Sequence, residues 1–271
     1  MQADRQLEAL KEIAVAAGQE ILAVYNQEEV INVTLKEDNS PLTEADRRAH
    51  RLIVDRLALL TPGVPILSEE SEPTDWSVRS QWDRYWLVDP LDGTKEFIKK
   101  NGDFTVNIAL IDNNKTVFGV IHIPVSNETY WGSKGNGSFC SNKNNDVKQI
   151  YVSRNHQNPI RLVASRSHPS EILNDLLEKI IDYEIIEVGS SIKFCLIASG
   201  QADCYPRFGL TSEWDIAAGE AIVKSAGGQV VNTNGDSMNY NVKEDYLNPN
   251  FIVSNGKIIS ERILSLINTG K

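Results

Sequence analysis

The sequence of 271 residues predicts a mixed α/β fold of the α+β kind, with a helix-plus-antiparallel-sheet N-terminal half and an α/β C-terminal half. Apolar residues recur at helical spacing in residues 7–25 and 45–60, which predicts two amphipathic helices. Two β-rich runs at 104–111 and 116–123 are joined by polar turn residues, which is a hairpin signal. After residue 159 short strands alternate with helices, as they do in α/β units.

The N-terminal half is expected to form helices first and then a sheet. Its elements, in chain order, are a helix at 7–25, a short strand pair or loop at 30–42, a helix at 43–60, strands at 64–67 and 86–88, the hairpin, and strands at 130–132 and 137–140. Pro62 and Gly63 stop the second helix. Residues 141–160 are polar and rich in Asn and Lys, so we place there the boundary between two domains, 1–158 and 159–271.

The C-terminal half is expected to alternate strands and helices that pack as layers. The strands are expected at 162–164, 184–188, 202–205, 229–231 and 251–253, and the helices at 170–181, 192–198, 216–226 and from 257 onward. Gly227 and Gly228 close the helix at 216–226.

Composition and charge exclude several classes of protein. Apolar residues make up 41% and charged residues 24%, which is ordinary for a globular protein. The net charge of −10, without a Lys/Arg block, argues against nucleic-acid binding as the main function. No apolar run approaches the ~20 residues that span a bilayer, and the N-terminus lacks a signal core, so we expect no integral membrane segment. Three cysteines without a CxxC pair indicate reduced thiols and a cytoplasmic protein.

One stretch combines a buried strand with chemistry-bearing residues. Residues 86–88 are apolar, and two carboxylates follow at Asp89 and Asp92 around a proline that forces a turn. Gly93 and Thr94 then lead into a segment that can open a helix. Two acids at a strand end can hold hard cations, while N–H groups of a helix start face a phosphate. The alternative for this motif alone is a surface turn rich in Asp, Pro and Gly.

Three further acids lie at similar places. Glu69 ends the strand at 64–67, Asp46 stands three residues after Thr43, and Asp215 opens a helix. Taken singly, Glu69 fits a solvated edge and the two aspartates fit helix caps. Together with Asp89 and Asp92, however, Glu69 and Asp215 follow strand or turn segments, where strand ends converge in open sheets. Carboxylates without nearby His or Cys select Mg²⁺-type ions over zinc.

Other catalytic classes lack their motifs. The four histidines show no metal-ligand spacing, and there is no Gly-x-Ser-x-Gly elbow for a Ser/His/Asp hydrolase. There is also no Gly-x-x-x-x-Gly-Lys-[Ser/Thr] loop of the P-loop NTPases.

Four motifs in order resemble the inositol monophosphatase superfamily of Mg²⁺-dependent, lithium-sensitive phosphatases. They are Thr43-Glu44-Ala45-Asp46, Ser68-Glu69-Glu70, Asp89-Pro90-Leu91-Asp92-Gly93-Thr94 and Trp214-Asp215-x-Ala-Ala-Gly219. The resemblance implies a layered αβαβα fold of the sugar-phosphatase kind. The likeness is greatest to the branch of CysQ-type 3′(2′),5′-bisphosphate nucleotidases, through Lys95-Glu96-Phe97-Ile98, Ser165-Arg166-Ser167-His168, residues 189–195 and Tyr205-Pro206-Arg207-Phe208-Gly209.

The resemblance implies a role for each matching residue. Glu69, Asp89, Asp92, Asp215 and the Leu91 carbonyl would ligate two or three Mg²⁺ ions. Asp46 and Thr94, with Glu69, would serve catalysis by orienting and deprotonating the attacking water. The substrate would be held by Asp92, Gly93, Thr94, His168, Ser190, Lys193, Arg207 and Asp215. Without the resemblance, Lys193 fits the polar edge of a helix, Arg207 a surface charge and Ser190 a helix cap.

The implied reaction is hydrolysis of the 3′-phosphate of adenosine 3′,5′-bisphosphate to AMP and phosphate, in sulfur assimilation and nucleotide recycling. Bound cations would let an acidic protein accept this anionic nucleotide bisphosphate. An inositol or sugar monophosphatase is the alternative enzyme, and a nucleotide-binding regulator is the alternative outside enzymes. Loose attachment to the inner face of the cell membrane is left open by the sequence.

Overall fold

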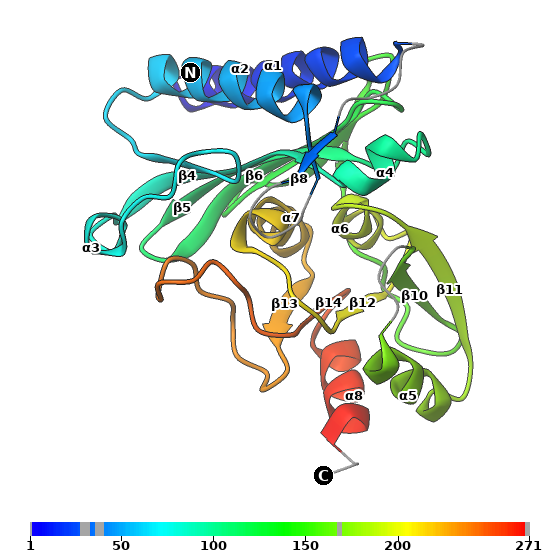
Figure 1. Cartoon of the computed structure of the whole chain (residues 1–271). Helices are drawn as coiled ribbons and strands as arrows, with labels where there is room; N and C mark the ends of the chain where they lie inside the picture. Colours follow the sequence, from blue (N-terminus) through cyan, green and yellow to red (C-terminus); the bar gives the residue numbers. More distant parts are fainter. Residues whose placement is uncertain (1, 28–32, 36–40, 167–169, 269–271) are drawn as a thin grey trace.

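The chain stacks its helices and sheets in five layers, helix–sheet–helix–sheet–helix (Figure 1). The computed structural model describes residues 2–27, 33–35, 41–166 and 170–268. In the first helical layer α1 (Gln2–Tyr25) and α2 (Glu44–Leu60) lie side by side; the middle layer holds α6 (Ile192–Ala198) and α7 (Glu213–Ser225); the last holds α5 (Glu171–Lys179) and α8 (Lys257–Asn268). Two short helices, α3 (Trp76–Arg79) and α4 (Thr94–Ile98), flank strand β4.

The larger sheet has seven strands in sequence order and belongs to the N-terminal half. Its strands are β3 (Ile66–Ser68), β4 (Arg84–Asp92), β5 (Thr105–Asp112), β6 (Lys115–Ile123), β7 (Glu128–Ser133), β8 (Gly137–Ser141) and β9 (Val147–Ile150). All neighbours pair antiparallel except β3 and β4, which are parallel. A separate antiparallel pair is formed by β1 (Val33–Leu35) and β2 (Pro41–Thr43).

The smaller sheet has five strands in the order β11-β10-β12-β14-β13. Its strands are β10 (Ile160–Ser165), β11 (Tyr183–Val188), β12 (Cys204–Arg207), β13 (Gln229–Asn232) and β14 (Phe251–Ser254). Strand β10 pairs parallel with β11 and β12, whereas β14 pairs antiparallel with β12 and β13.

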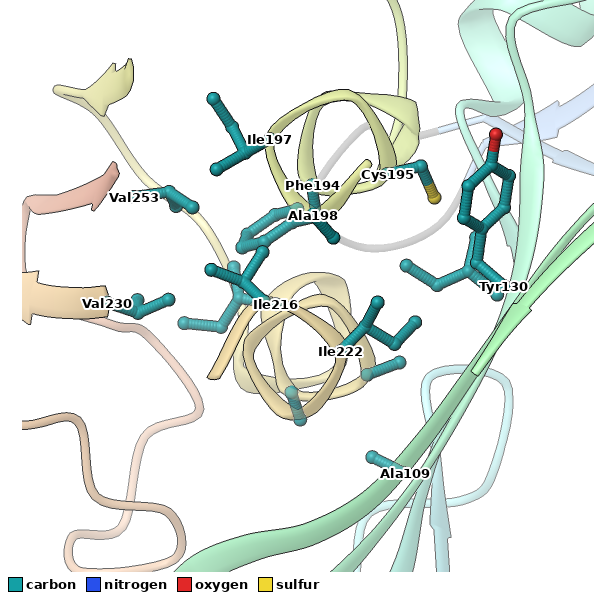
Figure 2. Close-up of a cluster of buried hydrophobic side chains, with 14 of the residues drawn as sticks. Ala109, Tyr130, Phe194, Cys195, Ile197, Ala198, Ile216, Ile222, Val230 and Val253 are labelled. Carbon is teal, nitrogen blue, oxygen red and sulfur yellow. The ribbon is translucent and has the colours of Figure 1, made fainter. Parts of the chain in front are cut away.

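The middle helical layer joins the two sheets through one buried apolar cluster. Figure 2 shows Ala109 and Tyr130 from the larger sheet on one side of α6 and α7, and Val230 and Val253 from the smaller sheet on the other. Helix α7 approaches the larger sheet so closely that a Cβ on Gly119 would overlap the backbone of Ala218. The two halves of the chain therefore share a core around α7.

The predicted fold class is confirmed, and most predicted elements exist within a few residues of their expected bounds. One predicted bound was wrong, because α7 begins at Glu213 rather than at 216. Two elements were not predicted: strand β9, within the polar stretch 141–160, and helix α3. The prediction for 30–42 falls partly outside the described residues. The division into domains 1–158 and 159–271 stays a prediction, although the two sheets separate between residues 150 and 160.

Within the described part of the chain, none of the helices is both long enough and apolar enough to cross a membrane.

Candidate active site

A β-bulge in β4 places Asp89 and Asp92 on one face of the sheet. Asp89 lies opposite Asn107 and Asp92 opposite Thr105, so three steps along β4 match two steps along β5. Residues two apart on β5 share a face, and directly opposed residues also share a face, so both aspartates point to the same side. In a regular strand residues three apart would point to opposite sides. Pro90, which has no N–H to donate, lies within the bulge.

Three carboxylates converge beside this bulge. Oxygen atoms of Glu69, Asp89 and Asp215 all lie within 4.8 Å of one another. Glu69 follows β3, Asp89 lies in β4, and Asp215 lies in the first turn of α7, so the fold brings together three segments distant in sequence. The carboxyl groups of Glu69 and Asp89 are hydrogen-bonded to each other.

Burial and repulsion by neighbouring carboxylates disfavour the charged forms of Asp89 and Asp215. Burial raises the pKa of Asp89 well above its usual range, and the charges of Glu69, Asp92 and Asp215 raise it further. Burial also raises the pKa of Asp215, with Asp92 and Glu69 adding to the effect, while the Ser212 N–H and Arg207 oppose it. Positive charge that enters the cluster favours the ionised forms of Asp89 and Asp215. The donors are all oxygen atoms, and an oxygen-only set fits a hard cation such as Mg²⁺.

Asp92 lies beside the cluster, and three donors form hydrogen bonds to one oxygen of its carboxylate. Its Oδ2 accepts hydrogen bonds from Ser190 Oγ (2.8 Å), Ser191 Oγ (2.7 Å) and Asn107 Nδ2 (3.4 Å). Ser190 and Ser191 come from the turn before α6, and Asn107 comes from β5. The carboxylate of Asp92 is therefore fixed by residues of both halves of the chain.

Asp46 and Thr94 meet next to the bulge. Thr94 Oγ1 lies 3.2 Å from Asp46 Oδ1 and 3.2 Å from the Leu91 carbonyl oxygen. Thr94 follows Gly93, whose φ of +93° is costly for any residue with a Cβ. A Cβ on Gly93 would also lie 2.9 Å from the Asp103 carbonyl oxygen. The glycine turn thus sets the position of the threonine hydroxyl against a buried carboxylate.

The helix-capping alternatives for Asp46 and Asp215 are compatible with a site role, because each carboxylate has two oxygens. Asp46 Oδ2 accepts from Thr43 N at 2.8 Å in the capping box of α2, while Oδ1 faces Thr94. Asp215 Oδ2 accepts from Ser212 N at 2.8 Å, and an oxygen of the same carboxylate belongs to the acidic cluster. Asp215 stands at the third position of α7 rather than at its cap.

One pocket of about 240 Å³ joins most of the predicted residues. It is lined by Glu69, Asp92, Gly93, Thr94, Ser190, Lys193, Arg207 and Asp215, together with Lys95, Glu96, Ser165, Gly189, Ser191, Phe194, Tyr205, Leu210, Thr211 and Ile216. Asp89 lies behind it in the cluster and Asp46 behind Thr94. Glu70, the neighbour of Glu69, instead lines a different hollow beside α2. His168 lies outside the described residues.

Two cations in the pocket are held in different ways. Lys193 is 6% exposed, its Nζ lies 3.4 Å from the Val188 carbonyl oxygen, and it faces the ring of Tyr205 at 5.5 Å. Burial lowers the pKa of Lys193 to about 8, and the charge of Asp92 opposes the shift. Arg207 donates from Nε to Thr211 Oγ1 (2.9 Å) and from Nη2 to the Leu210 carbonyl (3.2 Å). Lys193 is therefore buried rather than at the polar edge of a helix, and Arg207 is hydrogen-bonded rather than a free surface charge.

The helix-cap alternative for Ser190 was wrong, because Ser191 is the N-cap of α6. Ser190 has a φ of +52° and its hydroxyl contacts Asp92 and Thr105. Sequence reasoning missed Thr105, Asn107 and Ser191 as parts of the site. Thr105 and Asn107 looked like ordinary members of a β-rich run, and only their pairing opposite Asp92 and Asp89 distinguishes them.

Comparisons of the sequence with known proteins identify its family. The Inositol monophosphatase family matches residues 2–270. The chain belongs to the inositol monophosphatase family. Enzymes of this family are metal-dependent, which the acidic cluster fits. The resemblance predicted from four motifs is confirmed.

Relatives of this family member include nucleotidases. The chain is 48% identical to the 3′(2′),5′-bisphosphate nucleotidase CysQ of Escherichia coli K12 over 92% of this chain and 99% of the relative, and 36% identical to CysQ of Haemophilus influenzae over 89% of each. The crystal structure of CysQ from Bacteroides thetaiotaomicron matches with a TM-score of 0.81 and 43% identity over 91% of this chain and 96% of that one. An IMPase of Thermotoga maritima has the same TM-score at 28% identity, over 98% and 97% of the two chains. The nearer likeness to the CysQ branch is confirmed.

Proposed function

We propose that this chain is a Mg²⁺-dependent 3′(2′),5′-bisphosphate nucleotidase that hydrolyses the 3′-phosphate of adenosine 3′,5′-bisphosphate to AMP and phosphate. The relatives named CysQ support this substrate. The observation that carries the proposal is a single pocket that combines the carboxylates with two cations, Lys193 and Arg207. A substrate with a single phosphate needs only the carboxylates and their bound cations. A bisphosphate uses these and also Lys193 and Arg207.

The metal ligands of the proposed enzyme are Glu69, Asp89, Asp92 and Asp215, with the Leu91 carbonyl, and they would hold two or three Mg²⁺ ions. Bound magnesium compensates the negative charge of the substrate phosphate and lowers the pKa of a water molecule. Glu69, Asp89 and Asp215 bring their oxygens within 4.8 Å of one another, which suits shared cations. Glu69 also lines the pocket, and we assign it a catalytic role in addition to its role as a metal ligand.

Asp46 and Thr94 are proposed to handle the proton of the attacking water. Thr94 Oγ1 can accept a hydrogen bond from water while its own proton is directed at Asp46 Oδ1, 3.2 Å away. Asp46 then takes up the proton, and its other oxygen stays fixed by the start of α2. The water oxygen bonds to phosphorus as the bond between phosphorus and the 3′-oxygen breaks, and the departing 3′-oxygen takes up a proton from solvent, which yields AMP and phosphate.

Lys193 and Arg207 are proposed to bind the 5′-phosphate, with Ser190, Gly93 and His168 completing the nucleotide site. Arginine can bind a phosphate through two parallel hydrogen bonds, and a buried lysine offers a compact charge. The Arg207 side chain is already oriented by Thr211 and the Leu210 carbonyl, which lowers the entropic cost of binding.

A phosphate-release assay with a small panel of substrates tests the proposal. We expect turnover on adenosine 3′,5′-bisphosphate to exceed turnover on inositol 1-phosphate and on sugar phosphates. The reverse preference would favour an inositol or sugar monophosphatase. Nucleotide binding without phosphate release at saturating Mg²⁺ would favour a regulator.

Arg207→Ala is expected to raise KM for adenosine 3′,5′-bisphosphate roughly 10- to 100-fold, since hydrogen bonds to charged groups contribute about 1.5–3 kcal/mol. The KM for 3′-AMP, which lacks the 5′-phosphate, is expected to change little. Steady-state kinetics with both substrates measures the difference, and Arg56→Ala on the exposed face of α2 is the matched control. Equal changes of KM for both substrates would reject the assignment.

The preference for the bisphosphate is expected to fall as pH rises through about 8. Lys193 loses its proton near that pH and with it the charge that attracts the 5′-phosphate. The ratio of kcat/KM for the bisphosphate to kcat/KM for 3′-AMP measures this loss, because changes in the hydrolytic step affect both substrates alike and cancel. In Lys193→Arg, which stays charged, the ratio is expected to remain constant with pH. A pH-independent ratio in the wild-type enzyme would contradict the prediction.

A further inference from the structure

The hydroxyl of Ser191 is placed unusually for an N-cap residue. Ser191 is the N-cap of α6, a position where serine normally accepts a hydrogen bond from the helix backbone. Its side chain makes no capping hydrogen bond. Instead Oγ lies 2.7 Å from Asp92 Oδ2 and 2.8 Å from the Asp215 carbonyl oxygen, and the residue is only 2% exposed. The single proton of this hydroxyl can be donated to either acceptor, so Ser191 lies between two segments that carry carboxylates of the site.

A chain of buried polar side chains fixes this hydroxyl. Asn107 Nδ2 donates to Ser191 Oγ at 2.9 Å, and Thr105 Oγ1 donates to Asn107 Oδ1 at 2.9 Å. Thr105 Oγ1 also lies 2.6 Å from Ser190 Oγ, which in turn lies 2.8 Å from Asp92 Oδ2. These contacts form a ring that begins and ends at Asp92 Oδ2, in which the single proton of Ser190 is directed at either Thr105 or Asp92. Fully connected buried networks of this kind fix the orientation of their members.

The two carboxylate oxygens of Asp92 differ in their hydrogen bonds. Oδ2 is the acceptor for Ser190, Ser191 and Asn107, whereas within the described residues no hydrogen bond is directed at Oδ1. One oxygen is thus held by the protein and the other is available to a cation. Residues that orient a metal ligand in this way commonly change metal affinity or activity 10- to 100-fold when mutated.

We infer that Ser191, supported by Asn107, is a positioning residue for the metal site: it donates to Asp92 Oδ2 so that Oδ1 serves the cation. This inference rests on the proposed metal-dependent function. It predicts that loss of the Ser191 hydroxyl weakens cation binding more than it weakens nucleotide binding.

The test measures Mg²⁺ binding directly and through activity. Ser191→Ala is expected to raise the Mg²⁺ concentration for half-maximal activity, and the Kd for Mg²⁺ from calorimetry without substrate, by about tenfold or more. KM for the nucleotide at saturating Mg²⁺ is expected to change less than threefold. Ser191→Thr, which keeps a hydroxyl, is expected to restore Mg²⁺ binding.

Two further variants separate this role from simple folding effects. Ser199→Ala removes a serine hydroxyl at the other end of α6, where it donates to the Cys195 carbonyl at 2.7 Å, and it is expected to leave Mg²⁺ binding unchanged. Asn107→Leu removes the donor to Ser191 and the longer hydrogen bond to Asp92 at similar side-chain volume, and it is expected to weaken Mg²⁺ binding as Ser191→Ala does. The thermal unfolding of each variant without Mg²⁺ shows whether it is folded.

The inference is overturned if folded Ser191→Ala and Asn107→Leu both bind Mg²⁺ within twofold of the wild type. It is also overturned if Ser199→Ala weakens Mg²⁺ binding as much as Ser191→Ala does. Failure of the proposed function is a separate result, because it would show as absent phosphate release by the wild-type protein. The calorimetric measurement uses Mg²⁺ alone and does not depend on that outcome.

Discussion

Asp92→Asn is expected to lower kcat on the order of 10³-fold, about 4 kcal/mol of transition-state stabilisation, without unfolding the protein. The reason lies in the partners of the wild-type carboxylate. Oδ2 accepts hydrogen bonds from Ser190, Ser191 and Asn107. An amide has one oxygen and one NH2 group. If the amide oxygen accepts from these three donors, the NH2 group faces the cation and repels it. If the amide is turned round, its NH2 group faces three donors and can form no hydrogen bond with them.

Phosphate release from adenosine 3′,5′-bisphosphate across a range of Mg²⁺ concentrations measures this loss. Asp175→Asn, on the exposed face of α5, is the matched control and is expected to retain wild-type activity. Thermal unfolding checks that Asp92→Asn is folded. A kcat within tenfold of the wild type at saturating Mg²⁺ would reject Asp92 as a metal ligand.

Thr94→Val is expected to lower kcat roughly 10²- to 10⁴-fold, the range for loss of a group that moves a proton in the transition state. Valine has nearly the shape of threonine but cannot link a water molecule to Asp46. Because the carboxylate cluster is untouched, Mg²⁺ binding is expected to stay near the wild-type value. The effect should therefore appear in kcat rather than in KM or in the Mg²⁺ requirement.

Steady-state and single-turnover kinetics at saturating Mg²⁺ test this prediction. Thr94→Ser keeps the hydroxyl and is expected to retain most of the activity, while Thr233→Val, after β13 and outside the pocket, is the matched control. If Thr94→Ser is as slow as Thr94→Val, the hydroxyl is not what matters, and if both are as fast as the wild type, Thr94 has no part in proton transfer.

The sequence predicted the two halves of the fold because both leave a clear periodic signal. The apolar spacing of α1 and α2 and the hairpin of β5 and β6 are strong local patterns, and the structure confirms them. Helix α3 has only four residues, too few to show a period, and β9 is an edge strand with three exposed residues out of four, which read as a polar loop. The start of α7 was missed because Asp215 was interpreted as the N-cap, whereas it stands at the third position of the helix and Ser212 is the N-cap.

The site was partly predictable for a similar reason. Acids at strand ends and helix starts stand out in a sequence, so Glu69, Asp89, Asp92 and Asp215 were identified and lie together around the pocket. Their assigned roles stay predictions. Asn107 and Ser191 could not be found this way. The role of Asn107 depends on its cross-strand pairing with Asp89, and the role of Ser191 depends on contacts with Asn107 and Asp92, which lie 84 and 99 positions away in the sequence. Long-range polar pairing leaves no periodic trace in one sequence.

The shared use of carboxylates by helix caps and by the site guides the choice of an inactive protein for structural work. Asp46 and Asp215 each hold a helix start with one oxygen, so amide variants at these positions weaken α2 or α7 as well as the chemistry. Asp92 and Thr94 do not accept a hydrogen bond at the start of α2 or α7. A catalytically dead protein that still folds and captures intact nucleotide is therefore best sought by changing Thr94, which leaves both helix starts and the acidic cluster unaltered.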